Sequence, residues 1–188
     1  MVRPAQIVAL AAALLAGAPA RAAEPDEVDR GWTAVSPNAE HEAQQAASAA
    51  GCRLEVRHGQ TVEWARERCL GDKGDLHFVS NDGQDLIVVF AFPSRTGEPR
   101  HRTGLELVRR GETVRRLEVG KFVADDKTLI HASKHFYWVE GALGQPGVPP
   151  GYSKDGRSVE LTTLDRRGWS VGFDGTVKKI AMPKPLGR

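Results

Sequence analysis

Histidines at helical spacing are the first feature of this 188-residue chain that could do chemistry. His131 and His135 are four residues apart, so a helix would place both on one face, where they could bind a metal. A zinc protease has glutamate directly after the first histidine as its base, whereas Ala132 follows here. His135 also begins a segment with the pattern of a strand, which would separate the two rings. We therefore predict no metal site and no bound cofactor.

A serine in the string Gly-x-Ser-x-Gly is the second candidate for chemistry. Ser170 stands at the centre of residues 168–172, and a nucleophile elbow would need a strand before it and a helix after it. Strand-like residues flank Ser170 on both sides, so we predict a position in the middle of a strand. The acidic pair Asp125 and Asp126 is too short for a calcium loop. The sequence therefore predicts no catalytic residue.

Two tyrosines are the candidates for contact with a partner. Alternation along residues 136–138 places Phe136 and Trp138 on the core side and Tyr137 on the opposite side. Tyr152 is the single aromatic residue of a segment rich in glycine and proline, residues 141–157. Such a long loop could cover a groove or form a mobile hairpin end. We predict that Tyr137 and Tyr152 contribute to a binding surface.

The chain contains two cysteines, Cys52 and Cys69, and we predict a disulfide between them. They do not form Cys-x-x-Cys, and no histidine stands at zinc-ligand spacing beside either, which disfavours a redox or metal pair. The enclosed loop of about 17 residues would stabilise the fold by about 3 kcal/mol.

The N-terminus has the layout of a secretory signal peptide. Arg3 precedes an apolar run over residues 7–18, and Ala20-Arg21-Ala22 has the small residues of a cleavage site. The run is too short to span a bilayer. We predict a signal peptide at residues 1–22 and a secreted or periplasmic protein without a stable membrane anchor after cleavage.

The charge of the chain after removal of this signal is near zero. Two of the 26 basic residues lie in residues 1–22, which leaves 24 against 24 acidic residues, spread along the chain. This pattern argues against a nucleic-acid partner, which would require a clustered basic face. The length fits one domain. We predict a flexible arm at residues 23–35, a single β-rich domain at residues 36–181 and a flexible tail at residues 182–188.

Hydrophobic alternation with a period of two dominates the predicted domain. It indicates hairpins over residues 54–64, 105–119 and 158–173. The unbroken apolar run Leu86–Phe92 indicates a central strand buried on both faces. Residues 36–50 favour a helix, because Ser36 and Pro37 resemble a helix start and alanine, glutamate and glutamine follow. The predicted fold is mainly β, an antiparallel meander of hairpins that is sandwich-like or partial-propeller-like, with one short N-terminal helix.

An internal match and a resemblance support a β-rich module. Phe78–Asp82 matches Phe122–Asp126 without gaps, 44 residues apart, which is the length of many propeller blades. The stretch Leu105–Trp138, with a glycine-turned hairpin, a connector and an aromatic strand, resembles a loose group of uncharacterised secreted bacterial proteins. The resemblance implies an exported β-rich module and assigns no activity.

The function that we predict is an exported, non-catalytic module that binds a protein, a glycan or another component of the cell envelope. The alternative is a secreted hydrolase whose site is assembled from dispersed histidine, aspartate and glutamate residues. Histidines grouped with carboxylates in one cleft would favour the enzyme, whereas an aromatic-lined patch without perturbed titratable groups would favour the binding module. The histidines concerned are His58, His77, His101, His131 and His135.

Overall fold

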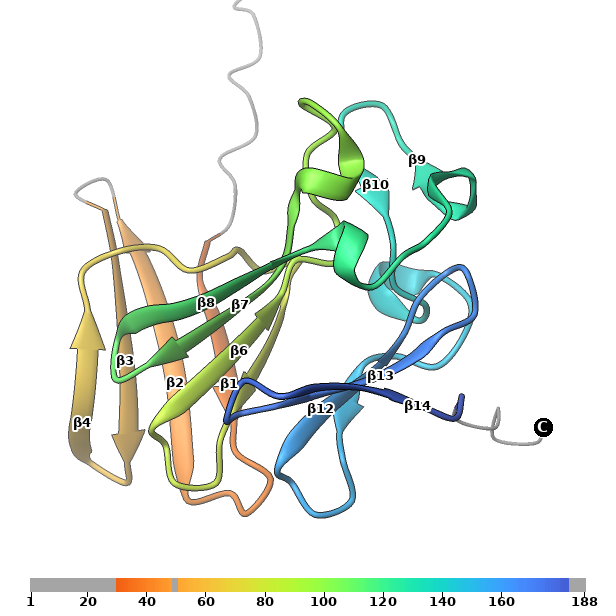
Figure 1. Cartoon of the computed structure of the whole chain (residues 1–188). Helices are drawn as coiled ribbons and strands as arrows, with labels where there is room; N and C mark the ends of the chain where they lie inside the picture. The colour runs from red at the N-terminus through yellow and green to blue at the C-terminus, as the bar shows by residue number, and fades with distance from the viewer. Residues whose placement is uncertain (1–29, 49–50, 183–188) are drawn as a thin grey trace, which may run out of the picture.

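Three four-stranded antiparallel sheets follow one another along the chain, as the computed structural model of residues 30–48 and 51–182 shows (Figure 1). In each sheet the strands lie in sequence order. Sheet I contains β1 (Trp32–Val35), β2 (His41–Ser48), β3 (Gly51–His58) and β4 (Thr61–Arg66). Sheet II contains β5 (Leu76–Val79), β6 (Asp85–Val89), β7 (Thr103–Arg109) and β8 (Glu112–Glu118). Sheet III contains β11 (Gly151–Tyr152), β12 (Ser158–Thr162), β13 (Gly168–Gly172) and β14 (Val177–Ile180).

A smaller insertion lies between sheets II and III. It contains the two-stranded pair β9 (Ile130–His131) and β10 (Phe136–Tyr137). Four 3-10 turns complete the described elements: η1 (Pro99–His101), η2 (Val119–Lys121), η3 (Asp126–Thr128) and η4 (Ala142–Gly144). This insertion contains Phe122–Asp126, the segment whose sequence matches Phe78–Asp82. Phe122–Asp126 connects η2 to η3 and forms no hairpin. The two matching segments therefore differ in structure.

Sheet II lies between the other two sheets, and β6 contributes one row of side chains to each of two cores. Leu86 and Val88 pack into the core shared with sheet I, together with Leu54 and other residues of that sheet. Ile87 and Val89 pack into the core shared with sheet III and the insertion. Leu86, Ile87, Val88 and Val89 are all fully buried, so the predicted central strand with two buried faces is confirmed for these residues, although β6 ends at Val89 rather than at Phe92.

The hairpins that alternation predicts are present, and β13 carries Ser170 in mid-strand as expected. Antiparallel pairing joins β3 to β4, β7 to β8 and β12 to β13. The aromatic segment forms a shorter strand than its pattern indicates, because β10 ends at Tyr137. Phe136 and Trp138 are fully buried, as the alternation predicts.

The predicted helix over residues 36–50 is wrong. Residues 41–48 form β2 instead, paired on one side with β1 and on the other with β3. His41, Ala43 and Gln45 are buried while the residues between them are exposed, which is the period of two of a strand. The sequence does not show this period, because its alanines, glutamates and glutamines are all good helix formers. The Gln45 side chain donates to the carbonyl of Gly71 (3.3 Å) and accepts from the amide of Leu70 (2.6 Å), so burial satisfies it. Tertiary pairing overrides local preference here.

The first hairpin of every sheet turns on the same hydrogen-bonded motif. In sheet II, the Ser80 hydroxyl donates to the Asp82 carboxylate (2.6 Å) and accepts from the amide of Asp85 (2.9 Å). The Asp82 carboxylate also accepts from the amide of Gln84, and Gly83 supplies the positive φ of 68° that the turn requires. The same bonds recur in sheet I, from Ser36 to His41, and in sheet III, from Ser153 to Ser158.

These three turns converge, and one tyrosine joins the strands that lead into them. The backbone N–H of Asn38 donates to Oδ1 of Asn81 (3.1 Å), and a Cβ on Gly156 would lie 2.9 Å from Nδ2 of Asn81. The Tyr152 hydroxyl, at the end of β11, donates to the carbonyl of Val35 (3.0 Å) and accepts from the amide of Val79 (2.8 Å). The first strands of all three sheets therefore meet at this hydroxyl.

The disulfide between Cys52 and Cys69 is present, with the two Cα atoms 4.9 Å apart. It joins the start of β3 to the segment after β4, within the part of the chain that forms sheet I. The predicted signal peptide at residues 1–22 lies outside the described residues, and so does most of the predicted tail. Part of the predicted arm, residues 32–35, forms β1. No helix among the described residues has the length and apolar character needed to cross a membrane.

Candidate functional site

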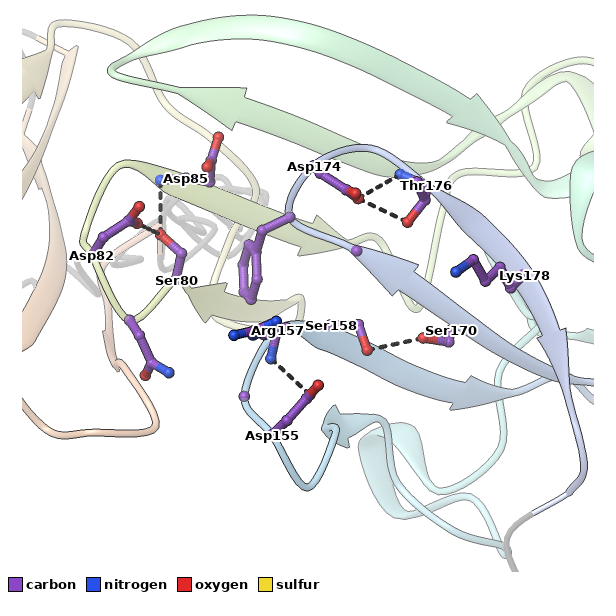
Figure 2. Close-up of a pocket in the computed structure, with 14 residues that line it drawn as sticks. Ser80, Asp82, Asp85, Asp155, Arg157, Ser158, Ser170, Asp174, Thr176 and Lys178 are labelled. Carbon is purple, nitrogen blue, oxygen red and sulfur yellow. Dashed lines mark hydrogen bonds between the residues drawn. The ribbon is translucent and has the colours of Figure 1, made fainter.

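A polar cleft of about 770 Å³ opens between the first turn of sheet II and the edge of sheet III (Figure 2). The Ser80–Asp85 turn forms one wall. The β11–β12 turn, with Asp155 and Arg157, and the β13–β14 turn, with Asp174, form the rest. Two copies of the repeated turn motif thus line one cavity.

Three carboxylates of this cleft have lowered pKa values and are held by their turns. Burial alone would raise the pKa of Asp82, but hydrogen bonds from Ser80 and Gln84 keep that pKa below its ordinary value. The Ser153 hydroxyl and the amide of Arg157 lower the pKa of Asp155 in the same way. The amide and hydroxyl of Thr176 lower the pKa of Asp174. These groups can accept hydrogen bonds from a ligand through their remaining lone pairs.

Donors and hydroxyls face the same space. Arg157 and Lys178 line the cleft, and their charges contribute to the lowered pKa values of Asp155 and Asp174, respectively. The Ser170 hydroxyl donates to the Ser158 hydroxyl at 2.9 Å, which places two hydroxyl groups side by side on the strands of sheet III. Phe173 supplies the apolar part of the lining. The cleft therefore presents acceptors, charged donors and hydroxyls around one aromatic side chain.

A second, smaller pocket of about 430 Å³ collects acids, histidines and aromatic rings. The loop after β4 contributes Asp72 and Asp75, and the connection between β6 and β7 contributes Phe92 and His101. His135 completes it from the insertion. Two of the five histidines named by the sequence analysis, His101 and His135, are therefore brought together with carboxylates.

Asp75 has the most perturbed carboxyl group near this pocket. Burial, reinforced by the charge of Asp72, raises the pKa of Asp75 to about 7. A Cβ on Gly71 would lie 2.9 Å from the Asp75 carboxylate and 3.0 Å from Nε2 of His77, so glycine permits this close packing. Burial lowers the pKa of His77 to about 4, and its ring stacks on Trp32 at 3.7 Å. A carboxyl group with a raised pKa and an imidazole with a lowered pKa thus both lie beside Gly71.

The two tyrosines proposed as contacts have different environments. Tyr137 is half-buried, and its ring packs against Phe92 (4.3 Å between centroids), which also stacks on His135 (4.6 Å). Tyr137 thus adjoins the smaller pocket. Tyr152 uses its hydroxyl to join the sheets, and its ring packs edge-on against Phe78. Binding through either tyrosine stays a prediction.

Apart from Ser170, which it considered only as a nucleophile, the sequence analysis did not identify the residues that line the polar cleft. The signal that could have found them is the recurrence of serine, two residues before asparagine or aspartate, at residues 36, 80 and 153. This pattern marks equivalent turns, and equivalent turns converge in the fold.

Comparison with known proteins adds no family. No family model matches the chain, and no curated protein matches it in sequence. A solved structure, Kuenenia stuttgartiensis hydrazine synthase, aligns with a TM-score of 0.37 at 12% identity, over 79% of this chain and 41% of that chain. The chain thus spans less than half the length of that structure.

Proposed function

We propose that this protein is an exported, non-catalytic module that binds a glycan of the cell envelope in the polar cleft. The observation that supports this is the lining itself. Two cationic side chains, four aspartates and two paired hydroxyls surround the space, so acceptors outnumber charged donors. A polyhydroxylated, uncharged ligand both donates and accepts hydrogen bonds, so such a lining can satisfy it.

A glycan is favoured over a protein partner because exposed apolar side chains do not gather on one element. The large hydrophobic residues exposed in the described part of the chain come from six different segments. They are Val35, Val62, Val114, Ile130, Leu143 and Met182. Stable protein interfaces ordinarily have a contiguous apolar centre.

The arrangement of the sheets supports a partial-propeller-like fold as part of this proposal. Propeller blades are four-stranded meanders whose first strands surround an axis. Here the first strands of sheets I, II and III meet at the Tyr152 hydroxyl, and their first turns converge. In this view the polar cleft lies between two successive blades.

Calorimetric titration with soluble peptidoglycan fragments and with neutral oligosaccharides tests the proposal. We expect binding of at least one of these glycans, and Arg157→Ala and Lys178→Ala should each weaken it about tenfold or more. Loss of a hydrogen bond from a charged donor costs about 1.5–3 kcal/mol, which is about 10- to 150-fold.

The matched control is Lys127→Ala, which removes an exposed lysine from η3, outside the cleft. It should leave affinity unchanged. Absence of binding to every glycan, or equal weakening by Lys178→Ala and Lys127→Ala, would contradict the proposal.

A secreted hydrolase is the second candidate, and the raised pKa of Asp75 favours it. A carboxyl group that is half protonated at pH 7 can act as a general acid, and such groups cluster at active sites. Asp72 is the candidate partner base, because its charge contributes to the raised pKa of Asp75. Histidines in the same pocket fit this class as well.

A test of the hydrolase uses chromogenic glycosides and esters with the wild-type chain and Asp75→Asn. A hydrolysis rate that decreases above about pH 7 and is lost in Asp75→Asn would support the assignment as a hydrolase. Asp126→Asn, a change in η3 outside this pocket, is the control that should retain activity. No hydrolysis by the wild-type chain would remove this candidate and leave the binding module.

A further inference from the structure

Two histidines and a glutamate from three adjacent strands meet at the rim of sheet I. His41 begins β2, His58 ends β3 and Glu63 lies in β4. Each offers one ligand atom, and these three atoms all lie within 4.8 Å of one another. Nε2 of His41 is 3.5 Å from Oε1 of Glu63, and the two imidazole rings stack at 4.9 Å.

Strand register brings the two histidines together. His41 and His58 are direct partners in the β2–β3 pair, so their side chains leave the sheet on the same side. That side is the core side, because Ala43 and Val56, two residues further along each strand, are fully buried. The two imidazoles therefore continue the rows of inward-facing side chains of β2 and β3 and lie at the end of the apolar core.

A β-bulge supplies the carboxylate. The β3–β4 register shifts between Val56 and Arg57, which pair with Trp64 and Val62. Glu63 is the extra residue and has no partner opposite it. Bulges re-aim side chains and are frequent beside functional sites. Here the bulge turns the Glu63 carboxylate toward His41.

Contacts from sheet II hold the carboxylate and one ring in place. The Gln84 side chain donates to Oε2 of Glu63 at 3.2 Å, which leaves Oε1 toward His41. Gly83 packs directly on the cluster, since a Cβ there would lie 2.3 Å from Cδ2 of His41 and 3.0 Å from Oε2 of Glu63. The Trp64 indole donates to the Gly83 carbonyl at 2.7 Å and fixes this wall. Such outer contacts are typical of ligands that a protein orients for a metal.

His41 lies at the buried end of the cluster. It is only 7% exposed, and its Nε2 is the ring nitrogen that faces Glu63. Its Nδ1 is buried without a hydrogen-bond partner among the described residues, and a metal bound at Nε2 would not supply that partner. Glu63 and the nearby Asp82, which interacts electrostatically with His41, give the surroundings a negative charge. A cation beside this ring would be stabilised by both.

We propose that His41, His58 and Glu63 bind a divalent transition metal of the zinc class. Two imidazoles and one carboxylate are a ligand set that zinc accepts, with a fourth position left for water or another ligand. Tetrahedral coordination at about 2.0–2.1 Å requires donor atoms about 3.3 Å apart, close to the 3.5 Å between His41 and Glu63. His58 is exposed and can rotate to complete the set. This site is distinct from the polar cleft, although the Ser80–Asp85 turn borders both.

The test is calorimetric titration of ZnCl₂ into the untagged, chelator-treated chain, with MgCl₂ and CaCl₂ as hard-cation controls. We expect one zinc ion per chain and no comparable binding of magnesium or calcium. Binding should weaken as pH falls, because protons compete with the metal for the ligand atoms. Zinc should also raise the thermal midpoint of wild-type protein, since a ligand that binds only the folded state stabilises it.

Three variants decide the assignment. His58→Ala and Glu63→Gln change exposed side chains, and each should lower zinc affinity at least tenfold while the metal-free thermal midpoint changes little. His131→Ala removes an exposed histidine outside the cluster and should bind zinc as wild type does. The proposal is overturned if wild-type protein takes up no stoichiometric zinc, or if His58→Ala and Glu63→Gln bind zinc as tightly as His131→Ala.

Discussion

Val88 and Val89, adjacent residues on β6, should be equally intolerant of change although their side chains point in opposite directions. Each is 0% exposed, but Val88 belongs to the core shared with sheet I and Val89 to the core shared with sheet III. Truncation of either valine to alanine removes two buried methyl groups and leaves a small cavity. At about 0.8 kcal/mol per buried carbon plus the cavity contribution, we expect Val88→Ala and Val89→Ala each to cost about 2–3 kcal/mol.

Aspartate at either position should cost considerably more. The strand partners of Val89 are Leu76 and Leu105, so a carboxylate there would have no polar neighbour. The partners of Val88 are His77 and Glu106, and an added carboxylate would lie beside the buried Glu106. A buried, unpaired charge adds several kcal/mol to the lost apolar burial. The total approaches the whole stability of a domain, about 5–15 kcal/mol.

Denaturant titration of purified variants measures these costs, and Val114 provides the matched control. Val114 is 50% exposed on β8, so Val114→Ala and Val114→Asp should each change the free energy of unfolding by about 0.5 kcal/mol or less. If either Val88→Ala or Val89→Ala were as mild as Val114→Ala, one face of β6 would be solvated and the three-sheet stack would be wrong.

Three further outcomes follow from specific contacts. Serine at both Cys52 and Cys69 should lower stability by about 3 kcal/mol in denaturant titration, given the separation of 17 residues, and recovery of two alkylated thiols from the native protein would contradict the cross-link. Tyr152→Phe should cost about 1–3 kcal/mol in the same assay, because it leaves a carbonyl and an amide without their partner; no change would mean that water replaces the hydroxyl. Burial raises the pKa of Asp75 to about 7, so this carboxyl group lowers the stability of the fold as pH rises from about 4 to 7. Burial lowers the pKa of His77 to about 4, so this ring lowers the stability of the fold as pH falls from about 6.5 to 4. The two effects oppose each other, so Asp75→Asn should lose stability on acidification from about pH 6.5 to 4 more steeply than wild type, and equal slopes in titrations across this range would refute the shift.

The strands that the sequence could predict are those whose hydrophobic pattern records their burial. Alternation identified the hairpin at residues 105–119, and an unbroken apolar run identified the doubly buried β6. Residues 36–50 misled because β2 is built from alanine, glutamate and glutamine, whose burial alternates without alternating in hydrophobicity. Only the pairing with β1 and β3 shows that Ala43 and Gln45 face a core.

The candidate sites were beyond prediction for a different reason. Asp82 and Asp174 share the polar cleft because two sheets pack together, and the sequence next to either residue does not indicate that the two are close in space. The repeated turn has a recognisable sequence pattern, but Ala39 stands in the first copy where the other two copies have glycine. The insertion also makes the spacing between the copies unequal. A search for equal spacing therefore favoured Phe122–Asp126, which is not an equivalent turn.

Because each sheet is made from one uninterrupted stretch of chain, the order of folding is constrained. Hairpins within a sheet close short loops and form in about 1–10 μs, whereas docking must join residues as distant as Val35 and Tyr152, 117 positions apart. The rate-limiting event should therefore be the stacking of preformed meanders rather than strand pairing. β6 and the interior of β7 are buried on both faces, so sheet II gains full stability only when both neighbouring sheets are in place. The molecule should behave as a short array coupled between nearest neighbours, in which the loss of either outer sheet unfolds the middle one.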